Sequence, residues 1–530
     1  MVTFDRRSFL QQAGTAAVAL GMGVLSRRVW ADAAATPEAS GVASGAISAF
    51  LDAVAGSKHE MHSLMLMRHG HSVAQGWWRP YRADTPQSLY SLSKSFTSTA
   101  VGLAVAEGKL KLTDRVVDFF PRQLPPSVSD NLKAMRVQHL LTMSAGHAAD
   151  TAPRITGEQD WVKAFLALPV ENAPGSTFVY NSGATYMLSA IVQKVTGEKL
   201  TDYLRPRLFD PLQVREAPWS ICPRGINTGG WGLSATTETL AKFGQLYLQQ
   251  GQWSGKQLLP RAWVREATSF KIQQPATTPG TDLAQLKQTS DWHQGYAYQF
   301  WRCRHDAFRG DGAFGQYCIV LPQQDAVIAI TSATSDMQGL IDLVWEHLLP
   351  GLRDKPLSTD ASASAKLQEQ LASLALPLPS GSTTSPMSSR ISGRSYGLES
   401  NSLGATSVGF RFEPDGCRFE LATAAGRFEV DCGLGRWADG ATSKPVTPPE
   451  ISELIGPPVG EQPPAKVAAA GAWTDTNTFH MQWRFYGTPH HDNVTCRFDA
   501  DRVQVEFKNS ITTLTGGGHP ETRPVLKGRA

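Results

Sequence analysis

The chain has 530 residues, of which 41% are hydrophobic and 18% are charged, an ordinary balance for a globular protein. Fifty basic and 47 acidic residues leave a formal net charge of +3, without a run of Lys and Arg that could follow a nucleic-acid backbone. These properties argue against a disordered chain and a nucleic-acid-binding protein, and the length favours two or more domains.

Residues 1–33 are predicted to be a twin-arginine signal peptide. Asp5-Arg6-Arg7-Ser8-Phe9-Leu10 has the twin-arginine pattern, and the apolar stretch 13–25 that follows is short for a membrane-spanning helix. Ala31-Asp32-Ala33 then offers small residues at a cleavage site. We expect export to the periplasm; an uncleaved anchor is the alternative. No later apolar run is long enough to span a membrane.

Residues 34–350 are predicted to form one α+β domain. Apolar periodicity predicts helices at 43–55, 91–108 and 338–349, and strands at 64–68, 72–78, 295–301, 316–321 and 326–331. Because strands lie at both ends of this region with helices between them, we expect an antiparallel sheet whose first and last strands meet, flanked by helices and a helical subdomain.

A change of composition marks the end of that domain. Residues 351–390 are rich in Ser, Thr, Ala and Pro and are predicted to be a linker with a short helix at 365–376. Residues 391–530 alternate strand patterns with turns and predict a small all-β domain, a barrel or a sandwich, with strands at 407–412, 418–421, 427–431, 478–486, 494–498 and 503–507.

The six cysteines form no C-x-x-C pair and no zinc spacing, so we expect neither a metal nor a cofactor. Cys303 and Cys318 flank a predicted hairpin, which leaves a disulfide and two buried free thiols equally open. Pro489-His490-His491-Asp492 contains metal-binding residue types, but a solvated loop is the favoured interpretation.

Ser91-Leu92-Ser93-Lys94 stands where a polar loop leads into the long apolar helix. The i, i+3 spacing places Ser91 and Lys94 on one helical face. A serine hydroxyl becomes a nucleophile when a base takes its proton, and a lysine can be that base if burial or a nearby cation lowers its pKa. A helix cap beside a surface lysine is the alternative, but the apolar residues that follow on nearly every face favour a buried Lys94.

Two other segments could complete such a site. Tyr180, in Phe178-Val179-Tyr180-Asn181-Ser182-Gly183, precedes an apolar helix and could move a proton if nearby cations lower its pKa. Gly310-Asp311-Gly312-Ala313-Phe314-Gly315-Gln316 leads into a strand, and its glycines would let a ligand approach backbone N–H groups. A core tyrosine and a hairpin turn are the structural alternatives.

Five segments, in this order, together resemble the serine β-lactamase and penicillin-binding-protein family over about residues 50–350. They are Ser91-Leu92-Ser93-Lys94-Ser95-Phe96-Thr97-Ser98, Leu112-Thr113-Asp114, Val137-Gln138-His139-Leu140-Leu141-Thr142-Met143-Ser144-Ala145-Gly146, the Tyr180 segment, and Gly229-Gly230-Trp231-Gly232-Leu233-Ser234-Ala235-Thr236. The resemblance is strongest to the class C-like group, which includes esterases, D-amino-acid peptidases and amide hydrolases.

The resemblance implies a role for each matching residue. Ser91 matches the nucleophile, Lys94 its proton partner and Tyr180 the tyrosine of the Y-x-N box. Gly312 matches the glycine of the K-T-G box, and the backbone N–H groups of Ser91 and Ala313 would form the oxyanion hole.

The sequence departs from true β-lactamases at two positions. Ser182 stands where they have Asn, and Gly310 stands where they have the Lys that helps to bind the β-lactam carboxylate. Arg302 and Arg309 are candidates for a replacement charge. These departures favour the esterase branch.

We therefore expect a serine hydrolase that cleaves an ester, amide or peptide bond in a small molecule or a short peptide. The alternatives are a D,D-peptidase or β-lactamase-type enzyme, and a non-catalytic sensor on the same fold. The sequence leaves the oligomeric state open.

Overall fold

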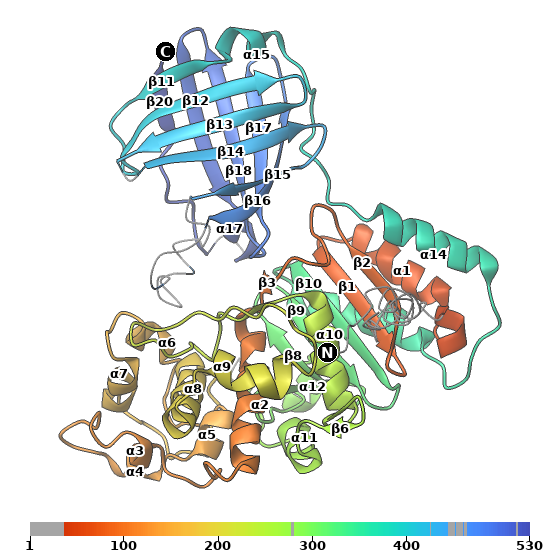
Figure 1. Cartoon of the computed structure of the whole chain (residues 1–530), viewed down its shortest axis with the longest axis vertical. Coiled ribbons are helices and arrows are strands. Elements are labelled where there is room, and N and C mark those ends of the chain that lie inside the picture. Colours follow the sequence, from red (N-terminus) through yellow and green to blue (C-terminus); the bar gives the residue numbers. More distant parts are fainter. Residues whose placement is uncertain are drawn as a thin grey trace, which may run out of the picture.

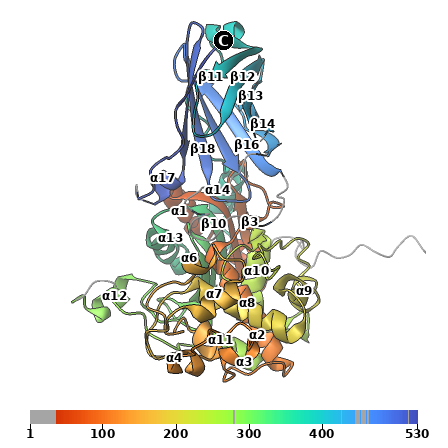
Figure 2. The same cartoon turned by 90° about the vertical axis from the view of Figure 1, so that its left-hand side faces the viewer.

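A computed structural model describes residues 36–276, 280–424, 426–443, 451, 459, 464–515 and 518–530. The predicted signal peptide, residues 1–33, lies outside the described residues and remains a prediction. Figure 1 shows an α+β domain below a β-barrel, and Figure 2 gives the view at 90°. The prediction of a mixed α+β domain followed by an all-β domain is confirmed.

The α+β domain is built on a six-stranded sheet with the order β2-β1-β10-β9-β8-β7. Its strands are β1 (Glu60–Arg68), β2 (His71–Trp77), β7 (Trp301–Arg302), β8 (Phe308–Gly312), β9 (Gln316–Leu321) and β10 (Ala326–Ala333). All neighbours are antiparallel, and β1 pairs with β10, which joins the two ends of the domain.

Alternating side chains divide the interior of this domain into two cores. Successive residues of a strand point to opposite faces. Leu64 and Leu66 of β1 pack into the core beneath α1 (Ser44–Ala55), whereas Met65 and Met67 pack into the core beneath α10 (Thr237–Leu248). Because helices cover both faces, every residue of β10 is buried.

Other helices surround this framework. α2 (Ser93–Ala106) packs against α8 (Ser182–Thr196), and α13 (Met337–Leu343) and α14 (Ala361–Ser373) pack beside α1. The remaining helices are α3 (Val116–Phe119), α4 (Asp130–Ala134), α5 (Val137–Leu141), α6 (Ala152–Ile155), α7 (Trp161–Ala167), α9 (Leu200–Leu204), α11 (Arg261–Thr268), α12 (Leu283–Thr289), α15 (Pro386–Ile391) and α17 (Ile511–Leu514). Short 3₁₀ or π turns are η1 (Pro37–Ser40), η2 (Tyr90–Leu92), η3 (Arg205–Phe209), η4 (Val344–Leu348) and η5 (Leu349–Gly351). Two small ribbons pair β3 (Gln87–Ser88) with β4 (Ser234–Ala235) and β5 (Gln252–Trp253) with β6 (Lys256–Gln257).

The C-terminal strands close into a barrel because β14 also pairs, in parallel, with β16. The strands are β11 (Arg394–Leu398), β12 (Ala405–Glu413), β13 (Gly416–Thr423), β14 (Gly426–Leu434), β15 (Ala438–Thr442), β16 (Ala465–Trp473), β17 (Thr478–Phe485), β18 (His491–Asp499), β19 (Arg502–Asn509) and β20 (Leu526–Arg529). Large side chains such as Phe410, Trp473, Trp483 and Phe498 form one buried core. Packing of this kind fills the interior of a small barrel.

The barrel contacts the α+β domain directly. In both views its end with α17 is directed toward that domain (Figures 1 and 2). Arg484 of β17 forms a two-fold ion pair with Glu60 of β1, at 2.7 and 3.0 Å. The backbone N–H of Ser88 donates to the carbonyl of Gly487 at 2.9 Å, just before the 3₁₀ turn η2.

Several predicted elements differ from the structure. Residues 295–301 contribute only Trp301 to a strand, because Gly295 and Gln299 have positive φ and bend the chain. β8 and β16 were not predicted; glycine in β8 and alanine in β16 are poor strand formers. The short helix predicted at 365–376 in the linker is present as α14, but it begins earlier, at Ala361, and packs on α1.

The six cysteines are free and buried, so of the two alternatives left open for Cys303 and Cys318 the structure has the buried free thiols. β8 separates the two residues, and their side chains lie in different cores.

The interpretation of residues 489–492 as a solvated loop is wrong, since His490 and Asp492 are fully buried. None of the helices in the described part of the chain is long and apolar enough to cross a membrane.

Candidate active site

Ser91 and Lys94 lie at the start of the buried helix α2. Ser91 belongs to η2, and Lys94 lies in the first turn of α2. Ser91 is partly exposed, whereas Lys94 is only 2% exposed. The Lys94 Nζ lies 3.0 Å from the Ser91 Oγ, so the structure brings the two predicted residues together.

Two further acceptors surround the amine of Lys94. Its Nζ lies 3.2 Å from the Ser182 Oγ and 2.8 Å from the carbonyl oxygen of Gly230. A neutral amine has two N–H donors and one lone pair. The three neighbours therefore allow it to donate to Ser182 and Gly230 and to accept the proton of Ser91.

Burial lowers the pKa of Lys94 to about 8, although the carboxylates of Asp150 and Asp311 act to raise it. About a tenth of the amine is thus neutral at pH 7, far more than for an ordinary lysine, and the neutral amine is the form that a general base requires. The sequence-based requirement for a buried lysine with a lowered pKa is met.

Tyr180 adjoins the pair from the segment before α8. Its ring lies 4.8 Å from the Lys94 Nζ and stacks on Trp301 at 5.7 Å, and its hydroxyl hydrogen-bonds the side chain of Ser91. The expectation of a lowered pKa is wrong, because burial and then the charge of Asp311 raise the pKa of this phenol. Tyr180 therefore keeps its proton at working pH and can relay protons only through a neutral hydroxyl.

The start of α8 fixes Ser182. Asn181 caps this helix by accepting from the N–H of Ala184 at 3.1 Å. The N–H of Ser182 donates to Asp150 Oδ1 at 2.8 Å. Asp150 thereby orients Ser182 and places a negative charge near Lys94, a role that sequence reasoning missed although the residue closely follows the Ser144-Ala145-Gly146 motif.

β8 forms the opposite wall of the site and packs against η2. A Cβ on Gly312 would lie 2.0 Å from the carbonyl oxygen of Leu89, so only glycine allows this approach. The contact brings the backbone of Ala313, the next residue, beside the turn that contains Ser91. The two predicted oxyanion-hole segments are therefore adjacent in space.

Gly310 and Asp311 give this wall its shape and its charge, respectively. A Cβ on Gly310 would lie 2.7 Å from the Ser95 Oγ, which leaves no room for a longer side chain. Asp311 is 7% exposed and pairs with Arg309 at 2.8 Å. Burial raises the pKa of Asp311, against the opposing charge of Arg309. Sequence reasoning named the Gly310-to-Gln316 segment but gave Asp311 no role.

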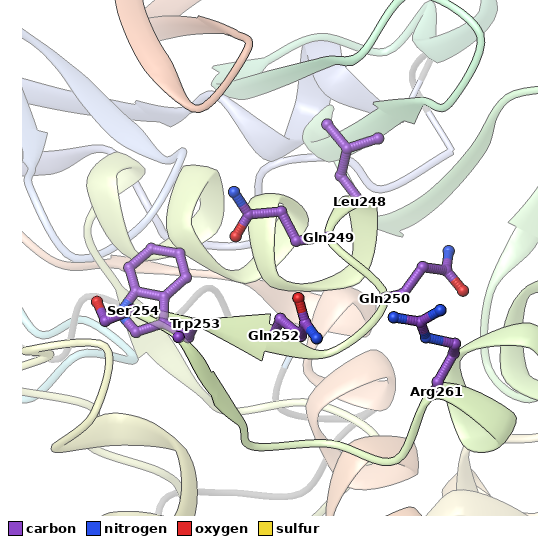
Figure 3. Close-up of a pocket in the computed structure, with 8 residues that line it drawn as sticks. Leu248, Gln249, Gln250, Gln252, Trp253, Ser254 and Arg261 are labelled. Carbon is purple, nitrogen blue, oxygen red and sulfur yellow. The ribbon is translucent and has the colours of Figure 1, made fainter.

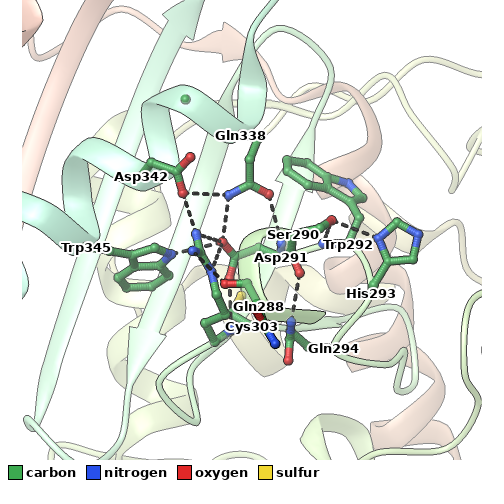
Figure 4. Close-up of polar contacts among 12 residues, drawn as sticks. Gln288, Ser290, Asp291, Trp292, His293, Gln294, Cys303, Gln338, Asp342 and Trp345 are labelled. Atoms are coloured by element: carbon green, nitrogen blue, oxygen red, sulfur yellow. Dashed lines mark hydrogen bonds and ion pairs between the residues drawn. The ribbon is translucent and has the colours of Figure 1, made fainter. Parts of the chain in front are cut away.

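Arg309, a candidate replacement charge, is fully buried behind Asp311. Its guanidinium lies 4.3 Å from the ring of Trp292 and donates to the carbonyl of Asp291 at 2.8 Å. The buried carboxylate of Asp291 in turn accepts from Arg304, Gln338 and Trp345 (Figure 4). Arg302, the other candidate, donates to the carbonyl of Thr268.

A hollow of about 450 Å³ lies elsewhere, between the end of α10, the β5–β6 ribbon and Arg261 (Figure 3). Its lining is mainly polar and includes none of the predicted site residues. In the described part of the chain, no group of three His, Cys, Asp or Glu side chains could hold a metal ion.

Comparison with known proteins identifies the family of this chain. The β-lactamase family profile matches residues 51–346. A 6-aminohexanoate-dimer hydrolase from Paenarthrobacter ureafaciens is 25% identical over 293 residues, which cover 52% of this chain and 73% of that protein. A β-lactamase from Escherichia coli K12 is 24% identical over 42% of this chain and 59% of its own length.

Among solved structures, an octameric penicillin-binding protein homologue from Pyrococcus abyssi is similar over 91% of this chain and 99% of its own, with 14% identity and a TM-score of 0.46. The family profile covers more than half of the chain. The chain therefore belongs to the β-lactamase family.

Proposed function

We propose that this protein is a serine hydrolase that cleaves an ester or amide bond through an acyl-enzyme on Ser91. The decisive observation is the contact of the Lys94 Nζ with the Ser91 Oγ at 3.0 Å, in a buried site that lowers the pKa of the amine to about 8. A non-catalytic sensor would not need a nucleophile paired with a base of this kind.

The reaction begins when the Ser91 Oγ attacks the substrate carbonyl and Lys94 takes its proton. The backbone N–H groups of Ser91 and Ala313 stabilise the tetrahedral oxyanion. Lys94 returns the proton, through the hydroxyl of Tyr180, to the leaving alcohol or amine as the bond breaks. A water molecule then attacks the acyl carbon and passes a proton to Lys94, and Lys94 gives this proton to the Ser91 Oγ as the bond between Oγ and the acyl carbon breaks and the acid leaves.

The surroundings of the site favour a small substrate or short peptide without a carboxylate next to the scissile bond. Position 310 has no room for a cationic side chain, and the charge of Arg309 is already paired with Asp311. The Arg309–Asp311 pair therefore offers a substrate carboxylate no unpaired positive charge. The aromatic surface of Tyr180, Trp301 and Trp292 suits an apolar acyl group.

A matched substrate panel with a covalent probe tests this function. We expect turnover of a neutral apolar ester or anilide, and at least about tenfold lower kcat/KM for the same compound with a carboxylate beside the scissile bond. A fluorophosphonate probe should label Ser91, as located by mass spectrometry. An unlabelled, inactive protein would favour the sensor, and release of D-alanine from a D,D-peptide at a comparable rate would favour a peptidase.

The pH dependence tests Lys94 as the base. Since the unprotonated amine is the active form, kcat/KM should rise with pH, reach half of its maximum near pH 8 and level off about one pH unit higher. Asp150 raises the pKa of Lys94, so Asp150→Asn should lower it and shift the rising limb toward lower pH, by up to about one unit.

Asp160→Asn is the matched control for this variant. Asp160 also accepts a backbone N–H, from Lys163, but at the start of α7. Its pH profile should match that of the wild type. If the rising limb of the kcat/KM profile of Asp150→Asn stays in place or moves to higher pH, Lys94 is not the base.

A further inference from the structure

The residues next to both proposed oxyanion-hole donors have an unusual backbone conformation. Tyr90, before Ser91, has φ of 47°, and Phe314, after Ala313, has φ of 65°. Residues with a bulky side chain rarely adopt these angles unless their surroundings hold them there. The positions of the two donors therefore depend on what contacts Tyr90 and Phe314.

The barrel supplies those contacts. The Tyr90 Oη lies 2.8 Å from the Nε2 of His490, which precedes β18. The ring of Phe314 packs edge-on against Tyr90 at 5.4 Å and against His490 at 5.1 Å. Ile511 of α17 and Ile451 complete this buried cluster.

The other side of Phe314 is held by the α+β domain. The Ser332 Oγ donates to the carbonyl of Phe314 at 2.9 Å, and the backbone N–H of Thr334 donates to the same oxygen at 3.1 Å. The backbone of Phe314 is thus bonded to its own sheet, while its ring packs against the barrel histidine. A change at His490 would act on Tyr90 and Phe314 together.

We propose that His490 of the barrel is a positioning residue that holds Tyr90 and Phe314, and through them the oxyanion-hole N–H groups of Ser91 and Ala313. This inference rests on the proposed function and gives the barrel a part in catalysis. His490 does not touch the reacting atoms.

His490 acts as a neutral ring. It is fully buried, and burial, followed by the nearby His491, lowers its pKa to about 3. Asp492 raises this pKa and His62 lowers it further. The bond to Tyr90 is therefore insensitive to pH between 5 and 9, and the effect of losing it should be constant over that range.

A double-mutant cycle on the full chain tests the inference. Tyr90→Phe and His490→Phe each remove the hydrogen bond and keep an aromatic ring. We expect each to lower kcat for a neutral ester by about tenfold with KM within about twofold, less than the loss of a whole oxyanion-hole donor. The double variant should be no worse than either single variant, because both remove the same bond. His490→Gln, which restores a hydrogen-bonding group, should recover part of the rate.

A thionoester separates positioning from a loss of stability. Sulfur accepts hydrogen bonds weakly, so the thionoester gains little from the oxyanion hole. The ratio of kcat for the ester to kcat for the thionoester should fall about tenfold in Tyr90→Phe and His490→Phe. His480→Phe, which removes another barrel histidine, bonded to Thr495, should leave the ratio unchanged.

Two results overturn the inference separately from the function. If the wild type labels at Ser91 and hydrolyses the ester, but the variants keep its ester-to-thionoester ratio, His490 does not position the oxyanion hole. If the wild type neither labels nor hydrolyses, the proposed function fails, and this inference fails with it.

Discussion

Ser91→Ala is expected to lower ester turnover by about 10⁴-fold or more, the scale of loss when a catalytic serine is removed. Without the hydroxyl, no acyl-enzyme can form, and the contact at 3.0 Å leaves Lys94 with nothing to deprotonate. The side chain of Ser91 is partly exposed, so its loss should hardly change the midpoint of thermal unfolding. Steady-state rates and fluorophosphonate labelling measure the effect.

Ser98→Ala is the matched control for this prediction. Ser98 belongs to α2, the helix that contains Lys94, and among the described residues its buried hydroxyl has no hydrogen-bond partner. It should keep wild-type turnover and labelling. If Ser91→Ala hydrolysed the ester at the wild-type rate, the assignment of the nucleophile would be wrong.

The local part of the site was predictable from the sequence. Three-residue spacing on a helix places Ser91 and Lys94 on one face, and the apolar residues after them indicate a buried amine. The pKa of Tyr180 could not be predicted in the same way. It depends on how far tertiary packing buries the ring and on the nearby charge of Asp311.

The long-range part of the site was not predictable from periodicity. Gly230 and Asp150 approach Lys94 from distant loops, and no spacing rule connects such segments. His490 is 400 residues from Tyr90, its hydrogen-bond partner. Its neighbours His491 and Asp492 suggested a solvated loop or metal ligands, because their local sequence is polar and contains no sign of an interface.

The strands of the fold show the same division between features set by the local sequence and features set by long-range contacts. β9 was predicted with its observed bounds because five consecutive apolar residues follow Gln316, and all six residues are buried in the sheet. β16 was missed because five of its residues are Ala or Gly between Lys466 and Trp473, a composition that favours no strand. Pairing with β15 and β17 on the two sides, and with β14 at its end, overrides that weak local preference.

Arg484→Met is expected to destabilise the protein by about 3 kcal/mol, at the lower end for breaking a buried ion pair. Arg484 is 2% exposed, and its removal leaves the carboxylate of Glu60 without its cation at the domain interface. The loss is at the lower end because the side chain of Glu60 is 23% exposed. Urea unfolding followed by tryptophan fluorescence measures the change.

The same pair makes stability depend on pH with a definite sign. Burial would raise the pKa of Glu60, but the charge of Arg484 and the hydrogen bond from His62 hold it well below the usual 4.5. A depressed folded-state pKa means that the contribution is complete above about pH 4.5 and is lost as the pH falls. The difference in free energy of unfolding between Arg484→Met and the wild type should therefore become smaller as the pH falls below about 4.5.

Two controls distinguish a buried pair from a surface pair. Arg418→Met breaks an exposed ion pair with Asp431 on the barrel and should change the free energy of unfolding by less than about 1 kcal/mol. The double variant Glu60→Gln, Arg484→Met removes the unpaired charge and should recover much of the loss. If it stays as unstable as Arg484→Met, the cost comes from lost packing between the domains. Because Ser88 and Tyr90 contact the barrel beside Arg484, that loss of packing would also lower kcat.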